Sequence, residues 1–207
     1  MTDALLFDMD GTLVDWAEPN AISWNETFRN HGWWERELQP SDFRQYAGHT
    51  TAEIGKMCFP NLPEEESYQR IAVASEDEVP NLLKNAKWRH TFLPDAEFLA
   101  NLAKKYKLFI ISNCMAGYID AFFSLYGGRD WVVTYRDNRD GVPKAENIRR
   151  IVKEYGLKDP VYVGDTLMDQ AAAKEAGVRF LFASYGYGKV ENTPRIGSLE
   201  ELLDLEI

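Results

Sequence analysis

The chain has 207 residues, of which 45% are hydrophobic and 27% are charged, and its formal net charge is −10 at pH 7. This length fits one domain of ordinary size plus a smaller insertion, and the apolar content is too high for a disordered chain. The acidic balance argues against nucleic acid or an anionic membrane surface as a partner.

Cysteine content and targeting signals bear on the compartment. The two cysteines, Cys58 and Cys114, are too few for a disulfide framework. No stretch of signal-peptide type opens the chain, and no apolar run approaches the roughly 20 residues that a membrane-spanning helix needs. These features predict a cytoplasmic protein with free thiols and no membrane contact, for which a monomer is the default.

The first part of the chain combines one strand with a long helical segment. An apolar run at 4–8 predicts the strand. Helical patterns follow at about 18–30, 42–46, 50–59 and 63–87. We expect the last of these helices to begin near Pro63 and to bend at Pro80. Residues 16–87 are therefore predicted to form a small all-helical domain inserted after the first strand.

Strands and helices alternate after Pro94. Strands are predicted at 107–112, 131–134, 160–164 and 179–183, and helices at about 95–105, 118–126, 145–155, 167–176 and 198–204. Buried apolar strands that alternate with helices are typical of a parallel sheet covered on both faces. The sequence thus predicts an α/β fold with a Rossmann-like parallel sheet, formed by residues 1–15 and 88–207.

Polar residues follow three of the predicted strands. Asp8 and Asp10 end the first strand, Ser112 ends the second and Asp165 ends the fourth. Because ligands collect beyond the carboxyl ends of parallel strands, we expect these residues to share one site. A calcium loop and an ordinary turn are the alternatives at the first strand. The calcium loop is disfavoured because Leu13 stands where an EF-hand requires Gly.

Four short motifs occur in order along the chain. They are DMDGTL at 8–13, Ser-Asn at 112–113 after an apolar strand, Gly-Val-Pro-Lys at 141–144, and Gly-Asp-Thr at 164–166 with Asp169 beyond it. Each is common alone, but the ordered set resembles the haloacid dehalogenase superfamily, specifically its phosphatases. The glycine-punctuated segment 183–188 resembles that of phosphoglycolate phosphatase relatives, and the resemblance implies that the helical insert is a cap domain.

The resemblance implies Mg²⁺-dependent hydrolysis of a small phosphorylated metabolite through an aspartyl-phosphate. Asp8 would attack phosphorus, and Asp10 would protonate the leaving oxygen and then take a proton from water. Asp8, Asp165 and Asp169 offer the hard oxygen ligands that Mg²⁺ prefers. The family pattern implies that Asp10 adds its backbone carbonyl as a metal ligand.

Three further residues are expected to bind the transferring phosphate. Ser112 would contribute its hydroxyl, Lys144 its ammonium and Asn113 a nearby backbone amide. Lys144 also offsets the carboxylate charge. Considered alone, Lys144 would be a solvated surface residue, and Asn113 would only cap the following helix.

Alternative functions remain open at this point. A hexose-phosphate mutase of the same superfamily shares all four motifs. A phosphate-binding regulator without turnover is the alternative from a different class, although the intact Asp8 and Asp10 speak against it. A dehalogenase is disfavoured because Asp10 has no task when the leaving group is a halide.

Overall fold

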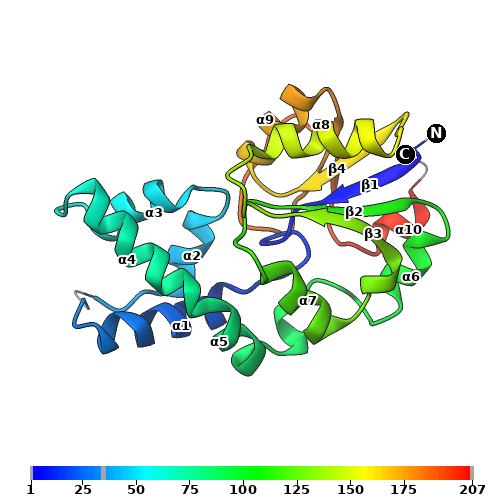
Figure 1. The fold of residues 1–207 in the computed structure, drawn as a ribbon. Coiled ribbons are helices and arrows are strands. Elements are labelled where there is room, and N and C mark those ends of the chain that lie inside the picture. The colour runs from blue at the N-terminus through cyan, green and yellow to red at the C-terminus, as the bar shows by residue number, and fades with distance from the viewer. Residues whose placement is uncertain (1, 34–35, 206–207) are drawn as a thin grey trace. The chain divides into compact units, whose positions relative to one another are not determined.

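The computed structural model describes residues 2–33 and 36–205, and the chain divides into two compact units (Figure 1). The α/β unit comprises Met1–Asp15 and Trp88–Ile207, and the helical unit comprises Trp16–Lys87.

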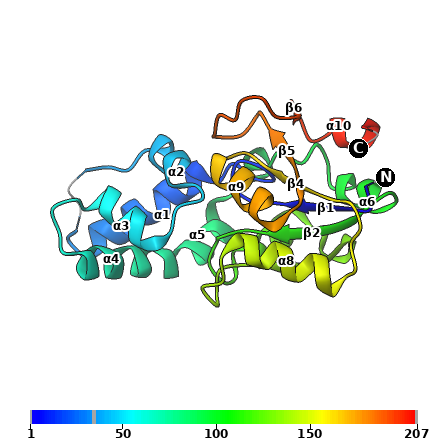
Figure 2. The ribbon, with the colours of Figure 1, turned by 90° about the horizontal axis from the view of Figure 1, so that it is seen from above.

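The α/β unit is built on a six-stranded sheet in which every pairing is parallel (Figures 1 and 2). The strands are β1 (Ala4–Phe7), β2 (Lys107–Ile111), β3 (Val132–Arg136), β4 (Pro160–Gly164), β5 (Arg179–Ala183) and β6 (Arg195–Ile196). Their order across the sheet is β3-β2-β1-β4-β5-β6. This arrangement confirms the predicted α/β fold with a parallel sheet, and it places β1 between β2 and β4.

Helices cover both faces of this sheet. They are α6 (Phe98–Ala103), α7 (Tyr118–Tyr126), α8 (Lys144–Glu154), α9 (Leu167–Ala176) and α10 (Glu201–Asp204), with 3₁₀ turns at Trp88–His90 and Arg129–Trp131. Figure 1 shows α8 and α9 on one face and α7 on the other. The short β6 was not predicted, and the last helix is shorter than the predicted 198–204.

The core of this unit follows the two-residue period of the strands. Leu6, Phe109 and Tyr162 point to one face, where they pack with Ile148 and Ile151 of α8. All of these side chains are fully buried, and each contributes about 1.5–3 kcal/mol relative to exposure. The central strands are therefore rigid supports for the residues that follow them.

The helical unit has its own aromatic core. Its helices are α1 (Ala17–Asn30), α2 (Pro40–Tyr46), α3 (Thr51–Cys58), α4 (Glu64–Glu76) and α5 (Glu78–Asn85). Trp24 meets Phe43 edge-on with ring centroids 4.9 Å apart, and Phe28 contacts Phe59 at 5.2 Å. None of the helices within the described residues is long and apolar enough to cross a membrane.

The predicted bend at Pro80 is wrong. The helical path breaks at Asp77, between the end of α4 and the start of α5. Asp77 is fixed there by α1, since the Thr27 hydroxyl donates to Asp77 Oδ2 at 2.8 Å. Pro80 lies in the first turn of α5, where the N–H that proline lacks has no partner to lose.

Candidate active site

The turn after β1 directs Asp8 and Asp10 to the carboxyl edge of the sheet. The Asp8 N–H donates to the Val163 carbonyl at 3.0 Å, which continues the pairing of β1 with β4. Gly11 then adopts a φ of +80°, and a Cβ at this position would overlap the Asp165 carboxylate. Glycine is required here by both the backbone conformation and the close approach.

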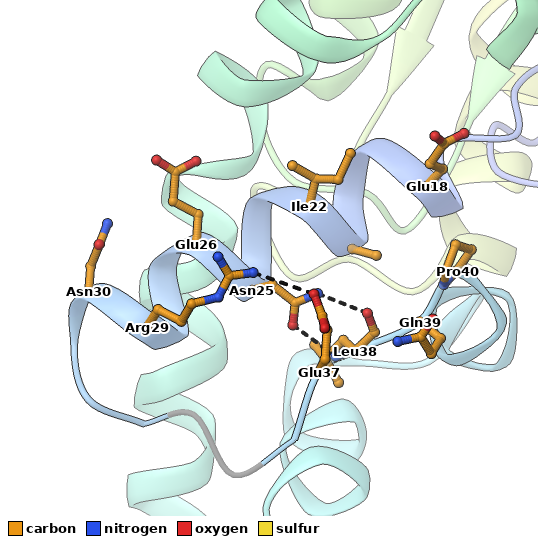
Figure 3. A pocket seen from close by; sticks show the side chains of 11 residues that line it. Glu18, Ile22, Asn25, Glu26, Arg29, Asn30, Glu37, Leu38, Gln39 and Pro40 are labelled. Atoms are coloured by element: carbon orange, nitrogen blue, oxygen red, sulfur yellow. Dashed lines mark hydrogen bonds and ion pairs between the residues drawn. The ribbon is translucent and has the colours of Figure 1, made fainter.

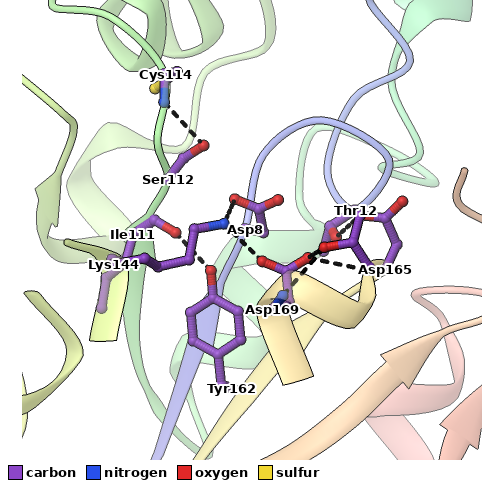
Figure 4. A network of polar contacts seen from close by, with 10 residues as sticks. Asp8, Thr12, Ile111, Ser112, Cys114, Lys144, Tyr162, Asp165 and Asp169 are labelled. Atoms are coloured by element: carbon purple, nitrogen blue, oxygen red, sulfur yellow. Dashed lines mark hydrogen bonds and ion pairs between the residues drawn. The ribbon is translucent and has the colours of Figure 1, made fainter. Parts of the chain in front are cut away.

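Three carboxylates from different elements converge at this edge (Figure 4). Within the described residues, Asp8, Asp165 and Asp169 place carboxylate oxygens within 4.8 Å of one another. Burial raises the pKa of Asp165 to about 8, and the charges of Asp8 and Asp169 add to this effect. Burial and the Asp169 charge likewise raise the pKa of Asp8 to about 6, against the opposing effect of Lys144. Without further positive charge, these acids therefore ionise less readily than exposed ones.

Lys144 supplies a cation to the cluster. Its ammonium donates to Asp8 Oδ1 at 2.9 Å and to Asp169 Oδ1 at 2.6 Å, and its side chain is 5% exposed. Burial alone would lower the pKa of Lys144, but the Asp169 and Asp8 carboxylates raise it well above its ordinary value. Lys144 is also the first residue of α8, where the helix dipole disfavours a cation. The carboxylates, not the helix, stabilise its charge.

Asp169 has a second set of contacts that fixes its orientation. Its Oδ2 accepts from the Thr166 N–H at 3.0 Å and from the Thr166 hydroxyl at 2.6 Å. The Asp169 N–H donates back to the Thr166 hydroxyl at 3.1 Å, so the pair forms a capping box at the start of α9. Both Asp169 oxygens thus have hydrogen-bond donors, one of which is Lys144.

Asp165 is held by the glycine-punctuated segment that the sequence singled out. The Tyr187 N–H donates to Asp165 Oδ2 at 2.7 Å, and the Thr12 hydroxyl donates to Oδ1 at 3.4 Å. A Cβ at Gly186 or Gly188 would overlap Asp165 or its backbone. These glycines therefore allow the segment to approach Asp165 closely, in addition to any role in turning the chain.

Asp10 contacts a residue that the motifs did not indicate. The Tyr118 hydroxyl donates to Asp10 Oδ1 at 2.7 Å. Burial raises the pKa of Asp10 to about 7, the Tyr118 hydrogen bond works against this rise, and the Asp8 and Asp15 charges add to it. The only sequence signal for Tyr118 is its place at the start of the helix that follows the Ser-Asn pair.

Ser112 and Asn113 lie where β2 ends, beside β1 in the sheet. Ser112 is buried, and its N–H donates to the Arg136 carbonyl at 3.0 Å. Its hydroxyl accepts from the Cys114 N–H at 3.4 Å (Figure 4). The structure therefore brings Asp8 and Ser112 to the same edge of the sheet, and Lys144 reaches this edge from the start of α8.

A cavity of about 660 Å³ lies in the helical unit, between α1 and residues 37–40 (Figure 3). Arg29 pairs with Glu37 across it at 3.5 Å. Asn25 bonds to both the carbonyl and the N–H of Leu38, each at 2.8 Å. None of its lining residues belongs to the four motifs.

Buried acids and a lysine that converge at the carboxyl edge of a parallel sheet are typical of an enzyme site in an α/β fold. The chain belongs to the haloacid dehalogenase-like hydrolase family, whose model matches residues 5–183. This finding confirms the resemblance that the four motifs carry.

Individual relatives agree with this assignment. A phosphoglycolate phosphatase from Rhodobacter capsulatus is 24% identical over 200 residues, which cover 91% of this chain and 87% of that protein. A haloacid dehalogenase-like hydrolase from Streptococcus pneumoniae has a similar fold, with a TM-score of 0.80, 20% identity and coverage of 98% of this chain and 97% of its own. A predicted phosphoglycolate phosphatase from Haemophilus somnus also matches with a TM-score of 0.80, at 18% identity and with 98% and 97% coverage.

Proposed function

We propose that this protein is a Mg²⁺-dependent phosphatase that hydrolyses a small phosphorylated metabolite through an aspartyl-phosphate on Asp8. The observation that carries the proposal is the buried cluster of Asp8, Asp165 and Asp169 with the Lys144 ammonium between two of its members. Membership of the hydrolase family and the relative named as a phosphoglycolate phosphatase support it. Phosphoglycolate is accordingly the first substrate to test.

The donor set of the cluster fits Mg²⁺. Its oxygens are carboxylate oxygens, which this hard cation prefers, and three buried carboxylates face a single ammonium. Asp8 and Asp165 would hold the ion, together with the backbone carbonyl of Asp10. Asp169 would act through water, because its oxygens already accept from Lys144 and Thr166. When bound, the ion supplies the positive charge that lets an anionic phosphate approach the acids.

The two acids after β1 divide the chemistry. A carboxylate oxygen of Asp8 forms a bond to phosphorus while the ester P–O bond breaks, and Asp10 gives its proton to the departing oxygen. Water then attacks the phosphorus of the aspartyl-phosphate, and Asp10 takes a proton from that water. The bond between phosphorus and Asp8 breaks, which releases inorganic phosphate and restores both acids.

The surrounding residues hold the phosphate and limit access to it. The Ser112 hydroxyl, the Lys144 ammonium and a backbone amide near Asn113 would bind the phosphate oxygens. We assign the helical unit, residues 16–87, the role of a cap that excludes water and selects the leaving group. The burial of Lys144 among the acids argues against a solvated surface lysine.

Phosphate release tests the proposal directly. We expect the protein to release phosphate from phosphoglycolate and p-nitrophenyl phosphate with Mg²⁺ and to stop when a chelator is added. Asp8→Asn should abolish turnover. Asp130→Asn is the matched control, because Asp130 is exposed and precedes β3, at the opposite end of the strands. An Asp8→Asn variant as active as the parent would reject Asp8 as the nucleophile. If the protein is incubated with a hexose phosphate and isomerises it without releasing phosphate, the function is that of a mutase.

A further inference from the structure

The two acids that follow β1 contact chemically different partners. Asp8 Oδ1 accepts a hydrogen bond from the Lys144 ammonium at 2.9 Å. Asp10 Oδ1 instead accepts one from the neutral Tyr118 hydroxyl at 2.7 Å. Carboxyl groups that are close in sequence but differ in their surroundings are suited to different chemical tasks.

A neutral hydroxyl suits a carboxyl group that must both lose and gain a proton. An ammonium can only donate a hydrogen bond, so it favours the ionised carboxylate and opposes protonation. A tyrosine hydroxyl can donate to a carboxylate and, after rotation of its O–H bond, accept from a carboxylic acid. Tyr118 can therefore stay hydrogen-bonded to Asp10 in both protonation states.

The position of the Tyr118 hydroxyl is itself constrained. Tyr118 is the first residue of α7 and is 3% exposed. It follows Gly117, whose φ of +87° sets the direction in which the helix starts. The Tyr118 N–H donates to the Met115 carbonyl at 3.3 Å, which ties the start of α7 to the segment after β2. A buried ring has few alternative rotamers, so its hydroxyl restricts the orientation of Asp10.

We propose that Tyr118 is a positioning residue that holds Asp10 Oδ1 and leaves Oδ2 to exchange protons with the substrate. This inference rests on the proposed phosphatase function. In ester cleavage the Asp10 proton passes to the leaving oxygen as its bond to phosphorus breaks, and in hydrolysis Asp10 takes a proton from the attacking water. Without the Tyr118 hydroxyl both chemical groups remain, but the Asp10 carboxyl can rotate away from the reacting oxygen.

The test compares Tyr118→Phe with the matched control Tyr135→Phe. The Tyr135 hydroxyl also donates to a carboxylate, Asp120 Oδ1 in the first turn of α7, at 2.6 Å. Each variant is given an alkyl phosphomonoester, whose leaving oxygen needs a proton, and p-nitrophenyl phosphate, whose leaving group departs as an anion. First-turnover rates are measured with enzyme in excess, and KM is measured separately.

We expect Tyr118→Phe to slow the first turnover of the alkyl ester about tenfold, as a partial loss of general acid catalysis, and that of p-nitrophenyl phosphate by less than about threefold. KM should change little. Tyr135→Phe should match the parent with both esters. Equal losses with both esters in Tyr118→Phe, or a change in KM alone, overturn the positioning role.

A second measurement removes any contribution from altered folding. If Tyr118 acts through Asp10, Tyr118→Phe causes no further loss of rate in an Asp10→Asn background, whereas a general structural effect adds to the loss. Additive losses therefore also overturn the inference. A parent without Mg²⁺-dependent phosphate release rejects the proposed function. An active parent whose Tyr118→Phe variant is unchanged rejects only the role of Tyr118.

Discussion

The α/β unit and the helical unit differ in what they bury. The α/β unit buries several charged groups at the carboxyl edge of its sheet, among them Asp8, Lys144, Asp165 and Asp169. The helical unit buries a cluster of aromatic rings around Trp24. Burial of an ion costs several kcal/mol unless partners compensate for it, whereas burial of an aromatic ring stabilises the fold.

The aromatic residues are buried in a way that stabilises the fold. The buried acids are not explained by stability, so their burial needs another reason. The aromatic cluster of the helical unit is sufficiently explained by packing. Among its buried polar side chains, Asn25 forms paired hydrogen bonds with Leu38, whereas the Trp24 Nε1 group has no hydrogen-bond partner within the described residues. The acids of the α/β unit repel one another, and this repulsion contributes to the raised pKa of Asp165. A buried cluster that lowers the stability of the fold in this way is a candidate functional site.

Removal of Lys144 should have the largest effect on the charged cluster. Lys144→Met leaves Asp8 and Asp169 without their shared donor, which should lower kcat by at least about 100-fold and destabilise the fold by about 3–5 kcal/mol. Phosphate release and urea denaturation measure the two losses. Lys153→Met, an exposed position in the last turn of the same helix, is the control. Equal behaviour of the two variants would place Lys144 among ordinary ion pairs.

The aromatic cluster should respond in stability rather than in chemistry. Trp24→Ala removes the ring that contacts Phe28, Phe43 and Tyr46, at an expected cost of about 3–5 kcal/mol. Trp88→Ala, at a side chain that is 44% exposed, should cost far less. Denaturant unfolding measures both. A Trp24→Ala variant as stable as Trp88→Ala would show that this cluster does not stabilise the helical unit.

The pH dependence of stability should reflect the acids and not the rings. A carboxyl group whose pKa is higher in the folded state keeps its proton longer there, so its contribution is present at low pH and lost as pH rises through the folded pKa. The pKa of Asp165 is raised to about 8 and that of Asp8 to about 6. For each carboxyl group that stays protonated only in the folded state, the metal-free protein should lose up to about 1.4 kcal/mol of stability per pH unit. This loss runs from about pH 4 to about pH 6 for Asp8 and continues to about pH 8 for Asp165.

Excess Mg²⁺ provides the matched experiment for this pH dependence. A cation bound by Asp8 and Asp165 stabilises their ionised forms, so it should restore stability most at the alkaline end of the range. Thermal unfolding with chelator and with Mg²⁺ measures the difference. A metal-free melting temperature that rises over this range, or Mg²⁺ stabilisation that is stronger at low pH, contradicts the expectation.

The sequence predicted elements well where local signals mark both ends. The bounds of α7 and α9 match the predictions of 118–126 and 167–176. Gly117 and Gly127 flank the first, and Thr166 and Gly177 cap the second. The break at Asp77 was mislocated because a contact from α1 determines it, and no local pattern encodes such a contact.

The candidate site shows the same limit. Asp8, Asp165, Asp169 and Lys144 were found through motifs, because their residue types and order are written in the chain. Tyr118 was not found, because its contact with Asp10 spans 108 positions and depends on where α7 starts in the folded chain. Tertiary partners of predicted site residues are the part that required coordinates.

A threonine capping box occurs in both units, and its removal should give the smallest of the expected effects. Thr50 caps α3 in the helical unit and Thr166 caps α9 in the α/β unit, each in a capping box with an acid three residues on. The Thr50 box is exposed and its acid is Glu53. The acid of the Thr166 box is Asp169, which also accepts from Lys144.

Thr50→Ala and Thr166→Ala should therefore lose similar stability, about 1 kcal/mol each, but differ in activity. Thr166→Ala removes the hydroxyl donor to Asp169 Oδ2 and leaves the backbone N–H donor of residue 166. Asp169 then holds Lys144 less firmly, and kcat should fall by about tenfold or less, as expected for loss of an outer hydrogen bond. Thr50→Ala should keep the parent kcat. Thermal unfolding and phosphate release on the two variants measure both quantities. Equal kcat values would mean that the box at α9 only caps its helix, as the one at α3 does.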